Sequence, residues 1–64
     1  MKLTDLVRHL QTHGCILIRD RGKHSVYCNA ARERFTAVPR HREINTFTAR
    51  NICRDLGIPE PRQR

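Results

Sequence analysis

The chain has 64 residues, with 13 Lys and Arg against 6 Asp and Glu and a formal net charge of +7 at pH 7. A chain this short forms one domain, and a polyanion is the natural partner of a surface with this charge. No apolar run approaches the roughly 18 residues of a membrane span and no secretory leader is recognisable, so we expect a cytoplasmic protein without membrane contact.

The first predicted element is an amphipathic helix from about Thr4 to His13. Thr4 is the expected N-cap, and Gly14 is expected to end the helix in the left-handed conformation. The apolar residues recur at i, i+3, i+4 and i+7, which places them on one stripe. They are Leu3, Leu6, Val7 and Leu10.

A β-hairpin is expected next, with strands at 15–18 and 25–28. Val26 and Tyr27 favour the second strand, and Arg21-Gly22 is the predicted two-residue turn. A glycine bulge would shift the register that this turn sets. The predicted pairs are Cys15 with Cys28, Leu17 with Val26, and Arg19 with His24.

A third strand is predicted from Arg34 to Val38, because Phe35 and Ala37 alternate with Thr36 and Val38 before Pro39. Asn45 is expected to cap a second helix, with Ile44 packing back onto Ala49, and Gly57 to end it. The apolar stripe of this helix is Ala49, Ile52, Cys53 and Leu56.

The element order α-β-β-β-α predicts an α+β fold, in which a three-stranded antiparallel sheet carries both helices on one face. The two apolar stripes then share one core, and the other sheet face is open to solvent or a partner. Double-stranded RNA-binding domains have the same order. We expect one domain over residues 1–59 and a mobile basic tail at 60–64.

The most informative segment about function is the hairpin tip, where one histidine lies among three cations. Cleavage of RNA by its own 2′-hydroxyl requires one proton to be removed there and one to be delivered to the leaving 5′-oxygen. Histidine titrates near neutrality, so His24 is the candidate general acid or base. Basic neighbours would attract phosphate and stabilise charge in the transition state. The candidate RNA-binding residues are Arg19, Arg21, Lys23, Ser25, Arg40, His41 and Arg42.

Plainer interpretations stand beside these hypotheses. A basic hairpin with a histidine is more often a solvated loop, and His41 is either a surface residue, a phosphate contact or a second acid or base. Tyr27 and Phe35 are either stacking platforms for unpaired bases or core residues. The three isolated cysteines lack zinc-site spacing and are best interpreted as small buried hydrophobes, so no metal or cofactor is predicted.

Several landmarks, taken together and in order, resemble the HicA family of toxin-antitoxin systems over Lys2 to about Pro59. They are Gly14 after the first helix, the aliphatic strand at 15–19, Gly22-Lys23-His24, Val38-Pro39, and the closing stretch 48–58. The family usually has Gly-Ser-His at the third landmark, so Lys23 replaces a hydroxyl contact with a cation. Thr46 and Phe47 stand where the family often has glycine.

This resemblance implies a double-stranded RNA-binding-like fold and ribosome-independent cleavage of mRNA, with His24 at the position of the catalytic residue. It also implies neutralisation by a HicB-type antitoxin that covers His24, and we expect the free toxin to be monomeric. Two alternatives are a non-catalytic RNA- or DNA-binding module and a protein-interaction module that docks an acidic partner.

Overall fold

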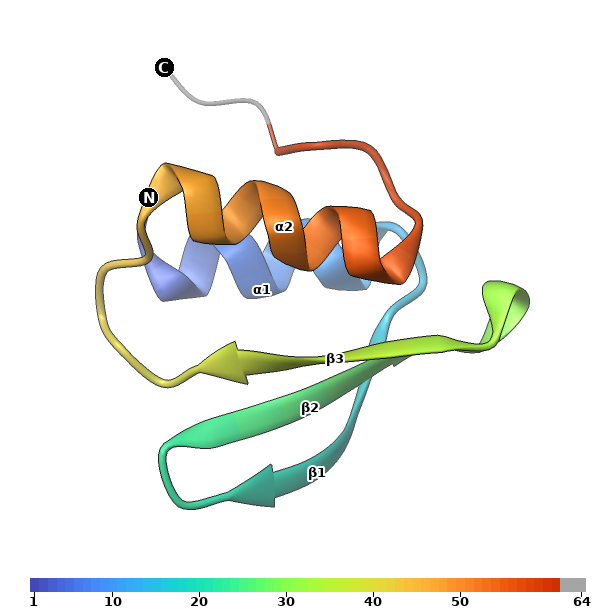
Figure 1. The fold of residues 1–64 in the computed structure, drawn as a ribbon, viewed down its shortest axis with the longest axis horizontal. Coiled ribbons are helices and arrows are strands. Elements are labelled where there is room, and N and C mark those ends of the chain that lie inside the picture. Colours follow the sequence, from blue (N-terminus) through green and yellow to red (C-terminus); the bar gives the residue numbers. More distant parts are fainter. Residues whose placement is uncertain (62–64) are drawn as a thin grey trace.

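The computed structural model describes residues 1–61. The strands form one antiparallel sheet in the order β1-β2-β3, and both helices lie on the same side of it (Figure 1). The predicted α+β fold and its element order are confirmed. None of the helices in this part of the chain is long and apolar enough to cross a membrane. The elements are α1 (Leu3–Thr12), β1 (Ile16–Arg21), β2 (His24–Asn29), the 3-10 turn η1 (Ala30–Arg32), β3 (Arg34–Pro39) and α2 (Thr46–Leu56).

The core lies between the helices and one face of the sheet. Leu6 and Leu10 of α1 are fully buried there, and the predicted stripe of α2 is buried along its whole length. Tyr27 and Val38 fill the core from β2 and β3. Tyr27 is therefore a core residue, because only 7% of its surface is exposed.

The predicted N-cap of the first helix is wrong, because Lys2 rather than Thr4 precedes its first turn. The backbone around Lys2 pairs with the loop before α2: Leu3 N donates to Arg42 O at 2.9 Å, and Ile44 N donates to Met1 O at 2.7 Å. This long-range pairing sets where the helix begins. No side chain caps it.

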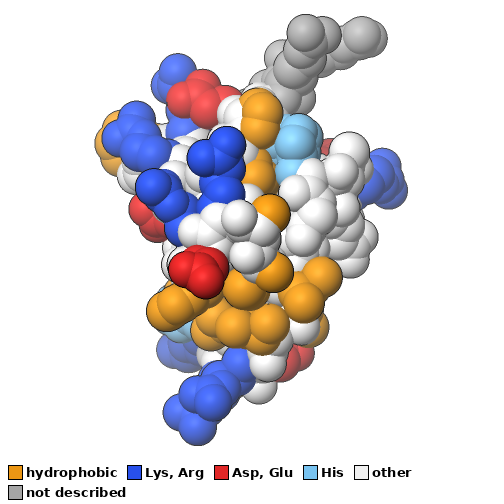
Figure 2. All heavy atoms as spheres, turned by 90° about the vertical axis from the view of Figure 1, so that its right-hand side faces the viewer, with side chains coloured by type: hydrophobic (Ala, Val, Ile, Leu, Met, Phe, Trp, Pro, Cys, Tyr) orange, Lys and Arg blue, Asp and Glu red, His pale blue; other side chains and the backbone are white. Residues whose placement is uncertain are grey.

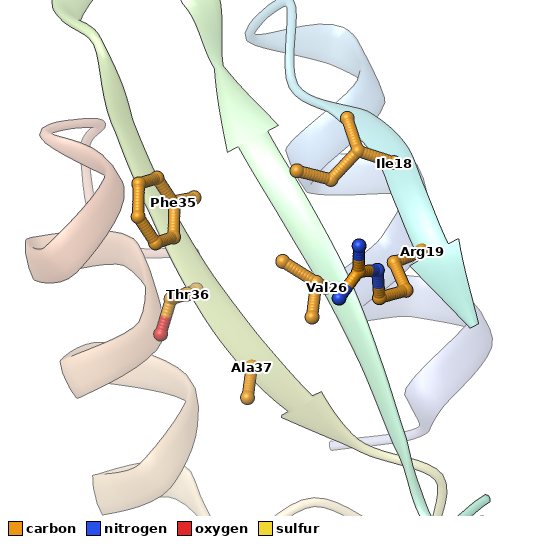
Figure 3. Close-up of a pocket in the computed structure, with 6 residues that line it drawn as sticks. All are labelled: Ile18, Arg19, Val26, Phe35, Thr36 and Ala37. Carbon is orange, nitrogen blue, oxygen red and sulfur yellow. The ribbon is translucent and has the colours of Figure 1, made fainter. Parts of the chain in front are cut away.

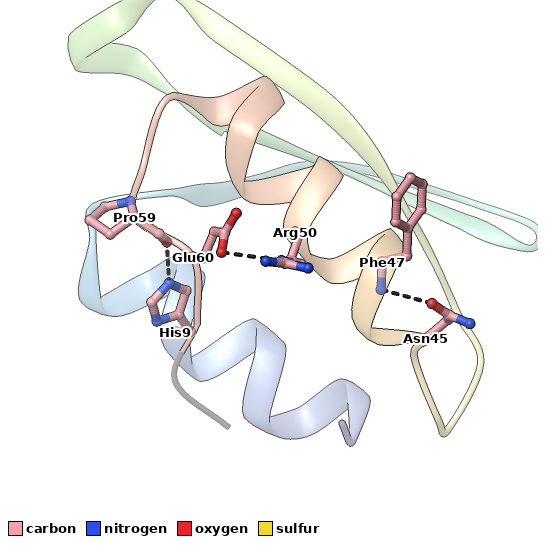
Figure 4. A network of polar contacts seen from close by, with 6 residues as sticks. All are labelled: His9, Asn45, Phe47, Arg50, Pro59 and Glu60. Carbon is pink, nitrogen blue, oxygen red and sulfur yellow. Dashed lines mark hydrogen bonds and ion pairs between the residues drawn. The ribbon is translucent and has the colours of Figure 1, made fainter. Parts of the chain in front are cut away.

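The cap predicted for the second helix is confirmed. The backbone N–H of Phe47 donates to the Asn45 side-chain oxygen at 2.7 Å (Figure 4). Gly57 ends α2 with φ +72°, and a Cβ at this position would lie 2.7 Å from the side chain of Arg32. The left-handed backbone conformation therefore favours glycine, and a larger residue would also displace the Arg32 side chain.

The predicted hairpin register is wrong in all three pairs, for two local reasons. The turn is Gly22-Lys23 rather than Arg21-Gly22, with Gly22 at φ +51°. A second shift occurs between Leu17 and Arg19, where β1 contains one residue more than β2 opposite it, as in a β-bulge. The observed pairs are Ile16 with Cys28, Leu17 with Tyr27, Arg19 with Val26, Asp20 with Ser25, and Arg21 with His24.

The segment after α2 turns back over the helices. The His9 Nε2–H donates to Pro59 O at 2.8 Å, and Arg50 pairs with Glu60 at 3.2 Å (Figure 4). Of the predicted tail at 60–64, residues 62–64 lie outside the part of the chain that the structure describes.

A buried asparagine joins the sheet to the end of α2. Asn29 is 5% exposed, and its Nδ2 donates to Leu56 O at 2.7 Å. Arg34 Nη1 donates to Arg54 O at 3.4 Å. Asn29 thus satisfies a carbonyl that the helix leaves without an intrahelical partner at its C-terminus, and Arg34 adds a second donor to a carbonyl that already accepts from Gly57 N at 3.1 Å.

We expect Asn29→Ala to lower the free energy of unfolding by about 1 to 3 kcal/mol, because the variant leaves the Leu56 carbonyl buried and unpaired. Urea unfolding followed by circular dichroism measures this. Asn51→Ala is the matched control, since Asn51 is only half-buried on α2 and should change stability little. Equal stability of the two variants would contradict the role given to Asn29.

Candidate nucleic-acid interface

The sheet face that points away from the helices is uncovered, and it is called the open face below. On β2, Tyr27 and Asn29 are buried toward the helices, so the alternating His24, Val26 and Cys28 point the other way. Their partners on β1 and β3 share that direction. The open face thus comprises His24, Val26 and Cys28 with Ile16, Arg19 and Arg21 of β1 and Phe35, Ala37 and Pro39 of β3.

His24 begins β2 and lies between Arg21 on one side and Pro39 on the other. Paired Cα atoms in an antiparallel ladder are about 4.5 to 5.5 Å apart, so the imidazole and the Arg21 guanidinium originate from neighbouring backbone positions. The His24 side chain is exposed, and it makes no hydrogen bond or ion pair with any of residues 1–61. The exposed imidazole is therefore accessible to a substrate.

Three of the candidate RNA-binding residues lie close to His24. Arg21 and Arg19 are on the open face, and Lys23 is exposed in the turn that precedes His24. Each of them is exposed. None of the strand residues that form the open face is acidic. The electrostatic potential at His24 is therefore suited to an anionic ligand.

Ser25 and Arg40 are held on the other side of the hairpin. The Ser25 hydroxyl donates to the Asp20 carboxylate at 3.0 Å. The Arg40 guanidinium lies 3.2 Å from the same carboxylate oxygen and donates to Gly22 O at 3.1 Å. The structure therefore does not bring these two candidates together with His24; they fasten the end of the hairpin.

The loop after β3 contributes the remaining candidates. Arg40 N donates to Lys23 O at 2.9 Å, so the loop begins against the hairpin turn and the exposed His41 follows at the same end of the sheet as His24. Arg42 lies farther along, where its backbone carbonyl accepts from Leu3 N and its side chain borders the start of α1.

The open face also has an apolar part that the sequence prediction missed. A shallow depression, called the Phe35 depression below, crosses all three strands (Figure 3). Phe35 is 68% exposed and Ile18 is 53% exposed. In a side view, hydrophobic side chains gather at the level of the sheet, with basic side chains above and below them (Figure 2). The depression is lined by Ile18, Arg19, Val26, Phe35, Thr36 and Ala37.

The alternating pattern of β3 in the sequence indicates two faces but does not show which face is exposed. Phe35 and Ala37 alternate with Thr36 and Val38, but both sets contain an apolar residue, so the alternation alone does not show which set faces the core. Val38 is buried and the Thr36 hydroxyl donates to Asp55 of α2 at 3.0 Å. Phe35 consequently points outward. It remains a candidate stacking platform for a base, whereas Tyr27 is buried in the core and does not.

The cysteines fulfil the sequence prediction at two positions out of three. Cys15 and Cys53 are buried in the core, and burial raises the pKa of the Cys53 thiol to about 11. Burial also raises the pKa of Cys15. Cys28 is only half-buried, because it lies on the open face. Within residues 1–61, no group of three or more His, Cys, Asp or Glu side chains is placed to hold a metal ion.

A family model described as HicA toxin of bacterial toxin-antitoxin matches residues 4–58, which include the whole sheet, α2 and all of α1 except Leu3. No curated protein and no solved structure shows a significant match.

The cysteines provide a test of which sheet face is open. In the native protein at neutral pH, we expect a thiol-specific reagent to modify Cys28 rapidly and Cys15 and Cys53 only on the timescale of unfolding, because the reactive thiolate is disfavoured by burial. Peptide mass spectrometry after a timed reaction identifies the modified residue. Rapid native-state modification of Cys53 would contradict the described core.

Proposed function

The chain belongs to the HicA family of toxins of bacterial toxin-antitoxin systems, and we propose that it is an endoribonuclease that cleaves mRNA without a metal ion. The observation that carries this proposal is the exposed imidazole of His24, which lies opposite Arg21 on the uncovered face of the sheet. A titratable ring beside a guanidinium, both exposed, combines a proton-transfer group with a cation that can stabilise charge on the phosphate during cleavage by a 2′-hydroxyl.

In the proposed reaction, His24 accepts the proton of the 2′-hydroxyl as the 2′-oxygen forms a bond to phosphorus. The bond between phosphorus and the 5′-oxygen breaks, and the 5′-oxygen receives a proton. The products are a 2′,3′-cyclic phosphate and a free 5′-hydroxyl. Arg21 and Arg19, which share the open face with His24, would stabilise the negative charge that builds on the phosphate oxygens.

His41 is the candidate for the second proton transfer. It is exposed in the loop that the Arg40 N to Lys23 O hydrogen bond holds against the hairpin turn. Protonated His41 would deliver the proton to the 5′-oxygen while His24 acts as base. His24 would otherwise serve both steps in turn.

The proposed protein partner is a HicB-type antitoxin, and the proposed setting is the cytoplasm. Because His24 projects from an uncovered sheet, a protein that covers the open face would block access of RNA to the imidazole. Inhibition would then require no change in the conformation of the toxin, which we propose is monomeric when free.

We expect His24→Ala to slow cleavage of a long RNA by roughly 100- to 10,000-fold, the contribution typical of general acid-base catalysis. Cleavage by the wild type should persist in EDTA. His13→Ala is the matched control, because His13 is an exposed histidine at the end of α1 that bonds to His9 O of its own helix. Gel electrophoresis of timed samples measures the rates.

A 2′-O-methyl group at the cleaved nucleotide should also prevent cleavage, since it removes the attacking hydroxyl. Undiminished cleavage by His24→Ala would overturn the catalytic assignment. RNA that the wild type retards in a native gel but leaves intact would favour the non-catalytic binding module, for which the net charge of +7 is sufficient.

His41→Ala should reduce the rate of cleavage as well, and the double variant should be little slower than His24→Ala, because the effects of a base and an acid that act together in one reaction are not additive. Single-turnover rates of the four proteins measure this. If His41→Ala cleaves RNA at the wild-type rate, His41 is not the second proton-transfer group and is only a surface residue.

A further inference from the structure

The Phe35 depression exposes apolar side chains to solvent, and these side chains are not part of the core. Phe35 and Ile18 are more than half exposed, and Val26 and Ala37 lie between them on the open face (Figure 3). The residues of β2 and β3 that pack in the core are instead Tyr27 and Val38. Contiguous exposed apolar surface on a small protein is typical of a binding site.

The border of the depression is cationic. Arg19 lines it, and its guanidinium lies beside Val26 (Figure 3). The acidic residues within the strands and α2 are directed away from the open face: Asp20 contacts Ser25 and Arg40, and Asp55 accepts from the Thr36 hydroxyl. An aromatic ring with a guanidinium nearby is complementary to a nucleobase joined to a phosphate.

The depression lies on the same open face as the proposed catalytic end of the sheet. Phe35 pairs with Cys28, which is four residues from His24 on β2, so Phe35 lies about 13 Å from His24 along the strand direction. Arg19 and Arg21 follow the same direction on β1. A single strand of RNA with its phosphate at His24 could therefore extend along the open face and place a nearby, non-adjacent nucleotide over Phe35.

We infer that the Phe35 depression binds an unpaired base of the RNA substrate, stacked on the Phe35 ring, with Arg19 holding an adjacent phosphate. This inference rests on the proposed function and specifies its substrate class as single-stranded RNA. A base inside a duplex is stacked between its neighbours and cannot present its flat face to Phe35.

The test measures binding in a His24→Ala background, so that RNA is not consumed and the result does not depend on catalysis. The probes are a fluorescently labelled, unstructured RNA oligonucleotide and the same strand annealed to its complement. Fluorescence anisotropy at one fixed salt concentration gives the two dissociation constants, because the ionic contribution to affinity varies with salt.

Phe35→Ala should weaken binding of the single strand by roughly 5- to 100-fold, the range expected for loss of one base–aromatic stack. Phe35→Tyr keeps the ring and should retain affinity. Phe47→Ala is the matched control, because Phe47 is 70% exposed at the start of α2, outside the sheet. The melting temperature of Phe35→Ala should be unchanged, since its side chain is outside the core.

A series of oligonucleotides with one abasic position then locates the stacked base. At that position, removal of the base should weaken binding to the protein with Phe35 but not to Phe35→Ala. Equal single-strand affinities of Phe35→Ala and Phe47→Ala would overturn the inference, as would tighter binding of the duplex than of the single strand.

Loss of antitoxin binding in Phe35→Ala, with RNA affinity intact, would also overturn it and identify the depression as a protein-docking surface. Failure of the proposed function would be seen in a different experiment. In that case, the wild-type protein would leave RNA intact in the cleavage assay, whatever the binding assay shows.

Discussion

Within residues 1–61, the two helices cover only one face of the three-stranded sheet, and the candidate site depends on this constraint. Each of its two helices has a single apolar stripe, and both stripes are used against the same sheet face. No further helix is available among residues 1–61 for the opposite face. His24, Arg21 and the Phe35 depression consequently lie on one accessible surface. The same surface would be available to an RNA substrate and to an inhibitory partner, which could therefore not occupy it together.

The hairpin determines which polar side chains reach that surface. The bulge after Leu17 and the turn at Gly22-Lys23 place Arg21 beside His24. Asp20 is directed to the opposite side, where it holds Ser25 and Arg40. These contacts fasten the end of the hairpin without using the imidazole. The site therefore combines an anchored backbone with an unengaged histidine, and Arg40 supports it from the other side of the sheet.

The sequence predicted the features that depend on local periodicity and end signals: both apolar stripes, the order of the elements, the Asn45 cap and the end of α2 at Gly57. It did not predict features that depend on contacts between distant segments. The start of α1 is set by pairing with Arg42, and the Asn29 side chain meets the end of α2 only in the folded chain. His24 could be selected from its residue type and neighbours, whereas the position of Phe35 relative to it required the register.

The central claim is that RNA binds to the open face of the sheet. NMR titration of ¹⁵N-labelled His24→Ala protein with single-stranded RNA tests it most directly, because each amide reports on its own surroundings. We predict the largest shift changes at Arg19, Arg21, Val26, Phe35 and Ala37, with small changes in α1 and α2. Shift changes concentrated in the two helices, with the strands unaffected, would contradict it.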